Sequence, residues 1–436
     1  MKRYGLVIGV LIAATFMSLL TGCTTQKKSE LNPAEYTAGK KVAEEYDSTK
    51  TGRKLKVFGA AHSDGNYGVI YGQCAVGTVV TAKSQYGEAS VQSEGGSFAL
   101  RIPSPMHVDT VEVEVTQSYN GEQIGESISW SGKKKRADYG DEWNVVIGLE
   151  NQGFYRKMIP DFEQTNFLSE YVCDDAQKRY ADRVENLKTV GEGCEMICVL
   201  VPSPMTVYPE QVPKELASQG GGASKFDQIS NMLEGAGAKV IDLRQTFAEH
   251  KDDEFPLYYN FDSHWTEYGA YLAYVELYDY ISDKYPDAMP RKFDEFTWNW
   301  GYYSYGDMPY YFDVCHGGRV YEYTIKREMN FETDFQVSRI SAQRYTRRDS
   351  LAYRAYSIDV VNGGSYDTGR ENLPSIFVYR NSYGAQMFDL LLDRSNQATI
   401  NPIFTYAYNF AQIKRAEPDY VIYIMTEWDF DNFINN

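Results

Sequence analysis

The chain has 436 residues, which is long for one ordinary domain and predicts two. Its 43% hydrophobic content is enough for a sizeable core, and its formal net charge of −17 argues against a nucleic-acid partner, because phosphate binding needs a basic face. The acidity is typical of a solvated extracellular surface. The 37 Tyr and 6 Trp could line a carbohydrate site or pack a core, and composition alone does not separate these two uses.

A targeting signal is predicted in residues 1–23. Two basic residues precede an apolar run over residues 5–20, which is short for a membrane-spanning helix. The run ends in Leu20-Thr21-Gly22-Cys23, which resembles a bacterial lipobox, where the chain is cut before the cysteine and that cysteine carries lipid. We therefore expect Cys23 to attach the exported protein to the outer face of the cell membrane. An uncleaved anchor helix is the alternative.

The first folded unit is predicted at residues 53–136, after a polar tether at residues 24–52. About seven short β-rich segments and the hairpin signal Asn120-Gly121 predict a small β-sandwich. The unit resembles the immunoglobulin-like modules of bacterial surface proteins. We interpret it as a spacer, with glycan contact as the alternative. The basic run at 133–136 marks a domain boundary, or else a contact with acidic lipids or wall polymers.

Strands and helices alternate in the second unit, at residues 140–436. Strands are predicted at 196–201, 239–243, 375–379 and 420–425, and helices at 177–188, after Ser224, after Thr266 and at 386–392. Such alternation predicts an α/β domain with a mostly parallel sheet and helices on both faces. Residues 296–360 give no readable pattern.

An Asp and a His stand two positions apart at Asp262 and His264, just before a strong helix pattern. In an extended segment such residues point to the same side, so they can face one pocket together. A carboxylate beside an imidazole fixes its tautomer and stabilises the imidazolium, as a general base requires. The other four histidines, at 62, 107, 250 and 316, lack this setting.

The best nucleophile candidate for this base is Ser382, which follows a predicted buried strand. In parallel α/β folds the site lies beyond the carboxyl ends of the strands, where Asp242, His264 and Ser382 are all expected. A strand-to-helix turn also offers free backbone N–H groups that can stabilise an oxyanion. As alternative readings, Ser382 is a plain helix cap and the Asp262–His264 pair is structural.

Several segments of the second unit resemble one family. Asp262-Ser263-His264-Trp265-Thr266 with Gly269-Ala270-Tyr271 looks like the signature of the DHHW proteins, SGNH-hydrolase-like relatives of the alginate O-acetylation (AlgX- and AlgJ-like) proteins. Weaker likenesses occur in the same order at 201–210, 227–229, 240–243, 306–308, 381–383 and 418–420. The resemblance implies a three-layer α/β/α domain of the SGNH-hydrolase type.

The resemblance also implies a catalytic triad of Ser382 as nucleophile, His264 as base and Asp262 as its orienting acid. Three departures from the family pattern are Ser263, Arg380 and Asn381, and the last two alter the nucleophile turn. The second oxyanion donor is open, and Asn381, Tyr383, Tyr406 and Asn409 are candidates for oxyanion or substrate contact. Trp265 is either a sugar platform or a core residue.

Family members move acetyl groups onto exported polysaccharides, commonly beside a membrane-bound O-acyltransferase. We therefore expect a serine O-acetyltransferase or acetylesterase that acts on a cell-surface polysaccharide and receives acetyl groups from such a partner. The alternative is a non-catalytic glycan-binding lipoprotein with a degenerate site. No cofactor motif is present, and Cys194-x-x-x-Cys198 lacks further ligands at metal-site spacing. With Cys23 lipidated, five cysteines remain, which we interpret as buried small hydrophobes, with one disulfide among them as the alternative.

Overall fold

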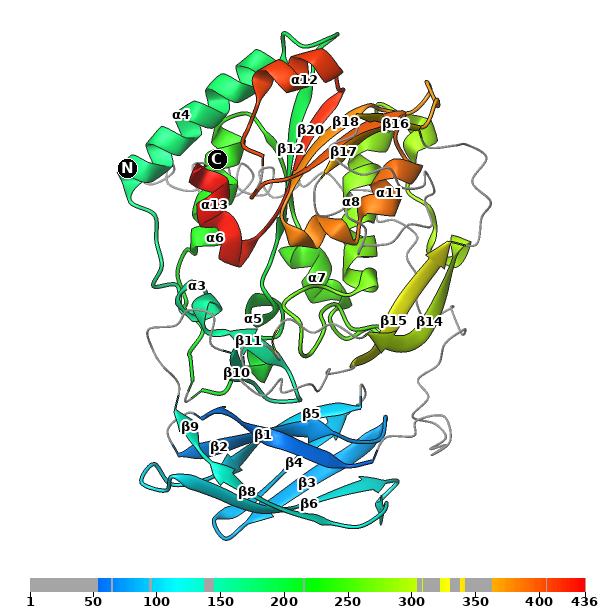
Figure 1. Ribbon diagram of the computed structural model, residues 1–436. Coiled ribbons are helices and arrows are strands. Elements are labelled where there is room, and N and C mark those ends of the chain that lie inside the picture. The colour runs from blue at the N-terminus through cyan, green and yellow to red at the C-terminus, as the bar shows by residue number, and fades with distance from the viewer. Residues whose placement is uncertain are drawn as a thin grey trace, which may run out of the picture.

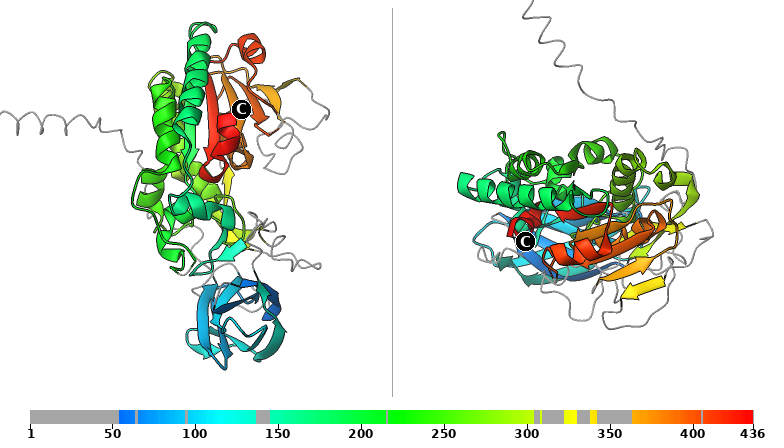
Figure 2. Two further views of the ribbon diagram at one scale, coloured as in Figure 1. Left: turned by 90° about the vertical axis from the view of Figure 1, so that its left-hand side faces the viewer. Right: turned by 90° about the horizontal axis from the view of Figure 1, so that it is seen from above.

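The computed structural model describes residues 54–63, 66–93, 96–136, 145–214, 216–303, 308, 322–329, 338–341, 363–404 and 406–435. The predicted signal peptide with Cys23, the tether, Cys315 and His316 lie outside these ranges. A β-sandwich forms one end of the molecule and a larger α/β domain the other (Figure 1 and the left view of Figure 2). No helix in the described ranges is long and apolar enough to cross a membrane.

The β-sandwich consists of two small sheets. One has the order β5-β2-β1-β9, and in the other β4, β3 and β6 are neighbours and β7 and β8 pair with β6. The strands are β1 (Lys56–Ser63), β2 (Tyr67–Gln73), β3 (Thr78–Ser84), β4 (Gly87–Ser93), β5 (Ser97–Pro103), β6 (Thr110–Tyr119), β7 (Glu122–Gln123), β8 (Ile128–Lys133) and β9 (Lys135–Arg136). The predicted Asn120-Gly121 turn joins β6 to β7, and both residues adopt positive φ, 50° and 83°.

The sandwich is packed against the α/β domain through Asn151 in the loop between β10 (Val145–Ile147) and β11 (Gly153–Tyr155). The Asn151 side chain accepts a hydrogen bond from Ala99 N (2.7 Å) and donates one to Ser97 O (2.9 Å). Val69 and Tyr71 of the sandwich share an apolar cluster with residues of β10, β11 and the α/β domain. The two units are therefore joined by a buried contact as well as by the chain.

A seven-stranded sheet organises the α/β domain, with the order β13-β12-β20-β18-β19-β17-β16. These strands are β12 (Glu195–Val201), β13 (Lys239–Asp242), β16 (Ser338–Ser341), β17 (Gly364–Asp367), β18 (Ile376–Arg380), β19 (Gln397–Pro402) and β20 (Tyr420–Thr426). The five strands from β13 to β19 pair in parallel, whereas β17 is antiparallel to both β19 and β16. The carboxyl ends of β12, β18 and β20 therefore lie side by side.

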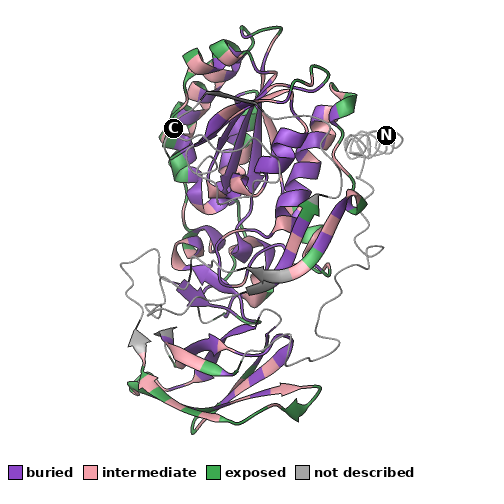
Figure 3. Ribbon diagram, turned by 45° about the vertical axis from the view of Figure 1, so that its right-hand side comes forward, coloured by how far each residue is buried: buried purple, intermediate pink, exposed green. Residues whose placement is uncertain are grey.

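Helices cover both faces of this sheet (Figure 1). One face packs against α7 (Arg244–His250), α8 (Glu267–Ser282) and α11 (Phe388–Asp393), and the other against α4 (Glu170–Leu187), α6 (Lys225–Gly235), α12 (Phe410–Ala416) and α13 (Phe430–Asn435). Neighbouring strand residues such as Phe377 and Val378 enter opposite clusters because side chains alternate along a strand. The central strands are buried along their length, whereas the outer sandwich strands are partly exposed (Figure 3).

The helix ends follow the predicted caps. Thr266 caps α8 and Ser224 forms a capping box with Asp227 at the start of α6. The helix predicted at 177–188 begins seven residues earlier, at Glu170, because Ser169 supplies its N-cap. The helix predicted at 386–392 is α11, which begins two residues later than predicted, and a 3₁₀ turn, η7 (Ser382–Ala385), precedes it.

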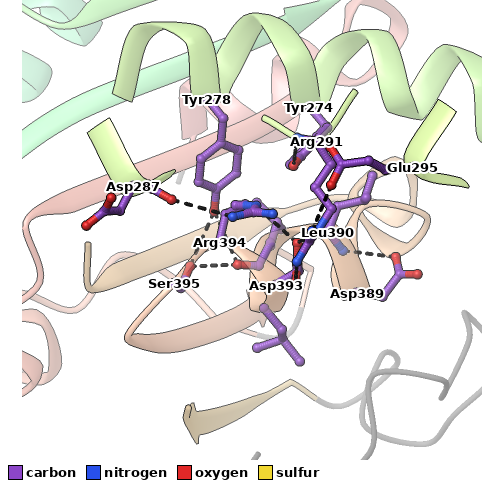
Figure 4. Close-up of polar contacts among 12 residues, drawn as sticks. Tyr274, Tyr278, Asp287, Arg291, Glu295, Asp389, Leu390, Asp393, Arg394 and Ser395 are labelled. Atoms are coloured by element: carbon purple, nitrogen blue, oxygen red, sulfur yellow. Dashed lines mark hydrogen bonds and ion pairs between the residues drawn. The ribbon is translucent and has the colours of Figure 1, made fainter. Parts of the chain in front are cut away.

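A charged pair joins the last residue of α11 to the segment that follows α8 (Figure 4). Asp393 is fully buried, and Arg291 donates to both of its carboxylate oxygens, at 2.7 and 3.2 Å. Nearby, the Tyr278 hydroxyl donates to Leu391 O (3.2 Å). A separate two-stranded antiparallel sheet consists of β14 (Phe296–Tyr303) and β15 (Glu322–Met329), and its Arg327 pairs with Asp389 of α11 (2.9 Å).

Four cysteines lie in the described ranges. Cys74, Cys194 and Cys198 are buried and Cys173 is half-buried. Burial raises the pKa of the Cys194 thiol to about 12, so this thiol stays protonated at neutral pH. The interpretation of Cys74, Cys194 and Cys198 as buried small hydrophobes fits this placement.

Candidate active site

The nucleophile candidate lies where the sheet rule places a site. Ser382 begins η7 directly after β18, at the carboxyl edge of the sheet, and is half-buried. Its backbone N–H is the first of the turn, and no described residue accepts a hydrogen bond from it. A free donor beside a hydroxyl is what an oxyanion site requires.

Asp262 and His264 form the pair predicted from their spacing. Asp262 Oδ1 lies 2.5 Å from His264 Nδ1 and also accepts a hydrogen bond from the His264 backbone N–H (2.9 Å). The Asp262 side chain is 4% exposed and that of His264 is 22% exposed. The carboxylate therefore holds Nδ1 as the protonated nitrogen and leaves Nε2 to act as a base.

Ser382 and His264 line one pocket of about 750 Å³. The other lining residues come from five segments of the chain: Tyr155, Lys157, Pro160, Asp161, Thr165, Asn166, Lys225, Ser263, Phe404, Trp428, Asp429, Asp431 and Asn432. Among the described residues, no hydrogen bond joins Ser382 Oγ to His264. Such contacts are often long in a free enzyme and tighten with substrate.

Four hydrogen bonds fix the nucleophile turn. Asn381 is fully buried, and its Oδ1 accepts from Tyr383 N (3.1 Å) while its Nδ2 donates to Thr426 Oγ1 (2.9 Å). The Trp265 indole N–H donates to Tyr383 O (3.0 Å), and the Tyr383 hydroxyl donates to Ser263 O. The turn is therefore held both by β20 and by the segment that carries the base.

The remaining candidates for oxyanion or substrate contact have other positions and partners in the structure. Asn381 points into the protein, and the Tyr383 N–H and hydroxyl are both engaged. Trp265 is fully buried in the apolar cluster with α8, so its ring belongs to the core. Asn409 caps α12 by accepting from Gln412 N (3.0 Å), and neither it nor Tyr406 lines the pocket.

Asp242, the third residue expected at the strand ends, serves another purpose. Its carboxylate accepts from Arg244 Nε (3.0 Å) and Nη2 (2.6 Å), and Arg244 also pairs with Asp227 (2.8 Å). None of these residues lines the pocket. His250 likewise pairs elsewhere, with Asp253 (2.7 Å), and is half-buried.

A charged group on the pocket wall was missed by the sequence reasoning. Lys225 is 2% exposed, and its Nζ lies 2.8 Å from Asp431 and 4.0 Å from Asp161. Burial raises the pKa of Asp161 to about 6, an effect that Lys225 and a 2.8 Å hydrogen bond from Asn166 oppose. These carboxylates come from α3 (Ile159–Phe162) and α13, which only the fold brings together.

An aromatic wall was also missed. Trp428 lies in η8 (Glu427–Asp429), and Lys157 Nζ sits 3.9 Å from its ring centroid. Trp428 follows β20 directly, so the strand-end rule that found Ser382 also pointed to it. Its neighbours Glu427 and Asp429 are buried, and burial raises the pKa of both carboxyls.

Comparison with known proteins identifies the α/β domain. Residues 166–345 match the family model described as the SGNH hydrolase-like domain of the acetyltransferase AlgX. The matched segment includes Asp262 and His264 and ends before Ser382. No curated protein matches the chain.

Solved structures of low identity are also similar. Bacillus cereus PatB1 is 13% identical, with 66% of this chain and 97% of that chain covered and a TM-score of 0.49. A DHHW family protein from Eubacterium siraeum is 13% identical (76% and 98% covered, TM-score 0.45), and Pseudomonas aeruginosa AlgX is 15% identical (65% and 62% covered, TM-score 0.42). At these values the structural likeness carries no conclusion about activity. The family match over residues 166–345 confirms the resemblance to the AlgX-type SGNH hydrolase-like domain that the sequence motifs predicted.

Proposed function

We propose that this protein is an exported, lipid-anchored acyl-transfer enzyme that moves acetyl groups to or from a cell-surface polysaccharide through an acetyl-Ser382 intermediate. The observation that carries the proposal is the shared pocket. Ser382 and His264 both line it, and the 2.5 Å Asp262 contact holds the imidazole from its other side. The shared lining and the Asp262 contact support assigning these three side chains to acyl transfer.

The chemistry runs in two steps. Ser382 Oγ attacks the acetyl carbonyl carbon while His264 Nε2 takes the hydroxyl proton, and the oxyanion forms beside the Ser382 N–H. Collapse breaks the bond to the leaving group, which receives the proton from His264. In the second step a glycan hydroxyl, or water, gives its proton to His264 and attacks the acetyl-serine carbonyl carbon. Collapse breaks the ester bond to Ser382 Oγ, which takes the proton back from His264.

The pocket chemistry supports a carbohydrate as the other reactant. Trp428 offers an amphipathic ring, and Lys157, Asn166 and Asn432 supply polar groups on the same wall. Sugars are bound by this combination of ring faces and hydrogen-bonding groups. The match to the SGNH hydrolase-like domain of the acetyltransferase AlgX supports acetyl transfer as the reaction. A membrane-bound O-acyltransferase would be the acetyl donor, and lipid on Cys23 would hold the enzyme beside it.

We further propose that residues 53–136 are an immunoglobulin-like spacer. The module is fixed to the α/β domain by Asn151, so it would set the distance of the pocket from the membrane. Of the basic residues at its end, Lys133 ends β8, and Lys135 and Arg136 form β9. Lys134 lies between these strands, and its Nζ donates to Ser104 O (2.9 Å) within the module.

The proposal is tested by burst kinetics with p-nitrophenyl acetate on the exported chain. We expect a burst of p-nitrophenol equal to the enzyme concentration, with acetyl on Ser382 by peptide mass spectrometry, and no burst in Ser382→Ala. Ser263→Ala is the matched control, because Ser263 lines the same pocket and its hydroxyl has no part in the mechanism. Equal bursts in the wild type and Ser382→Ala would refute the proposal.

The glycan-binding alternative predicts a different result. It requires polysaccharide retention without ester turnover, insensitive to Ser382→Ala. Its support from sequence was the altered turn at Arg380 and Asn381, yet Asn381 takes part in a complete hydrogen-bond set that holds the turn. Retention without an acetyl-enzyme would favour this alternative.

A further inference from the structure

Arg380 is a buried cation two residues before the nucleophile. It is the last residue of β18 and is 3% exposed. By strand alternation its side chain enters the same face of the sheet as Ile376 and Val378, which belong to the apolar cluster with α8 and α11. A guanidinium in such surroundings loses most of its hydration.

The charge of Arg380 is not neutralised by any residue that the structure describes. Its Nη1 donates to Asn381 O (3.2 Å), whereas Nε and Nη2 have no hydrogen-bond partner and no carboxylate lies within ion-pair distance. Arg327 and Arg291 differ, since they pair with Asp389 (2.9 Å) and Asp393 (2.7 Å). Leaving a buried charge unpaired costs several kcal/mol, so the position calls for a reason other than stability.

The single contact of Arg380 points to that reason. The carbonyl of Asn381 and the N–H of Ser382 are the two ends of one peptide group. A cationic donor on the oxygen polarises that group and strengthens its N–H as a donor, because hydrogen bonds in a chain reinforce one another. The Ser382 N–H is the donor that no described residue uses.

We propose that Arg380 is a positioning residue whose guanidinium holds and polarises the Asn381–Ser382 peptide, so that the Ser382 N–H stabilises the oxyanion of acyl transfer. The inference rests on the proposed function, since it assigns Ser382 as nucleophile. Low local dielectric makes an unneutralised charge act over a longer range than a surface charge would. Burial lowers the pKa of Arg380 to about 10, which leaves it protonated at neutral pH.

The turn is shaped around the stem of this side chain. A Cβ built on Gly384 would lie 2.7 Å from Arg380 Cβ and 2.9 Å from its Cδ, closer than such atoms approach. Gly384 therefore lets η7 pack directly on the arginine. This contact fixes the guanidinium relative to the turn whose peptide it serves.

The experiment compares Arg380→Met with the wild type in the full chain. We expect the rate of the p-nitrophenol burst to fall about 10-fold, less than the loss from removing an oxyanion donor outright. KM should change less than twofold, and Tm should stay equal or rise, because Met removes the cost of the unpaired charge. A merely structural role would lower Tm and activity together.

A second measurement separates weaker stabilisation of the oxyanion from a general change in packing. Methylboronic acid forms a tetrahedral anion on a serine and mimics the intermediate, and its Kd should rise about 10-fold in Arg380→Met, in step with the burst rate. Arg380→Lys keeps a cation and should recover part of the loss. Arg327→Met is the control for removal of a buried arginine, with a lower Tm and an unchanged burst rate per folded molecule.

The outcomes are distinguishable. A Ser382-dependent burst with a wild-type rate in Arg380→Met, or an Arg380→Met chain that does not fold, would overturn the role of Arg380 and leave the proposed function intact. A burst that persists in Ser382→Ala would overturn both.

Discussion

The indole N–H of Trp265 donates a 3.0 Å hydrogen bond to the backbone carbonyl of Tyr383, 118 residues along the chain. Trp265 follows His264 and Tyr383 follows Ser382, so this bond joins the segment of the base to the turn of the nucleophile. The Tyr383 hydroxyl completes the connection by donating to Ser263 O. The two catalytic candidates are therefore positioned by their neighbours, which lie in the core.

Replacing Trp265 with Phe should loosen this connection. The variant keeps a buried ring but leaves the Tyr383 carbonyl without its partner, which should cost about 1–2 kcal/mol of folding free energy. Because this hydrogen bond also joins the nucleophile turn to the segment of His264, its loss should lower the burst rate as well. Urea unfolding and burst kinetics measure the two effects. Trp298→Phe is the control, since Trp298 Nε1 donates to Phe293 O away from the pocket and its loss should affect stability alone.

Asp262→Asn should fold normally and lose most activity. The amide can still accept from the His264 backbone N–H, but it no longer holds Nδ1 as the protonated nitrogen or stabilises the imidazolium. A loss of about 10³–10⁴-fold in kcat is expected for a triad of this kind. Near-wild-type kcat in Asp262→Asn would show that the pair is structural. Asp242→Asn, on a neighbouring strand end outside the pocket, is the control.

Asn381→Asp should destabilise the protein at neutral pH. Asn381 Nδ2 lies 3.4 Å from Asp429 Oδ2, so the change places two buried carboxylates together where an amide donor stood. We expect a loss of about 2–4 kcal/mol at pH 7. The loss should shrink as the pH falls, since burial already raises the pKa of Asp429 and one carboxyl of the pair will hold a proton.

The double variant Asn381→Asp/Asp429→Asn exchanges donor and acceptor and should recover most of that stability. Denaturant unfolding of both single variants and the double variant completes the cycle. Additive losses would show that the two side chains do not interact.

The buried carboxyl of Asp161 should make the folded state less stable as the pH rises. Burial raises its pKa from 3.8 in an exposed carboxyl to about 6, so the folded state binds this proton more tightly than the unfolded chain does. The penalty is absent below pH 3.8, grows as the pH rises to about 6 and is complete above that. The full penalty amounts to about 2–3 kcal/mol of folding free energy.

Asp161→Asn removes this titration and keeps an acceptor for Asn166. The Tm of the variant relative to the wild type should therefore increase between pH 4 and pH 7. Differential scanning calorimetry across that range is the measurement, with the exposed Asp182→Asn of α4 as control. A Tm difference that does not change with pH, or that favours the wild type at pH 7, would contradict the assignment.

Trp428→Ala should separate glycan binding from ester chemistry. The ring lies on the pocket wall beside Lys157 and packs edge-on against Tyr383 (6.2 Å between ring centroids), but it supplies no group to the acylation step, so a small aryl acetate should still acylate at a normal rate. Retention on a polysaccharide column and transfer to a polymer acceptor should weaken, by about 1–3 kcal/mol for one large aromatic contact. Unchanged retention would place the sugar elsewhere.

The sequence by itself determined the local features of the α/β domain. The apolar run of β12, the caps at Ser224 and Thr266 and the Asp262–His264 spacing all depend on residues within a few positions of one another, and each was readable. The family resemblance rested on the same short segments and was confirmed over residues 166–345. The turn at Ser382 and the helix after it were also readable, although the helix begins two residues later than predicted.

Only the tertiary structure decided how these pieces meet. It placed Ser382 in one pocket with His264, put Trp265 in the core, and turned Asn381 inward onto Thr426. It also gathered Asp161, Lys225 and Asp431, which are separated by up to 270 residues (431 − 161), onto one wall. Sequence patterns report which face of an element is apolar. They do not report which distant element covers it, because that is settled by the burial and hydrogen bonding of the whole fold.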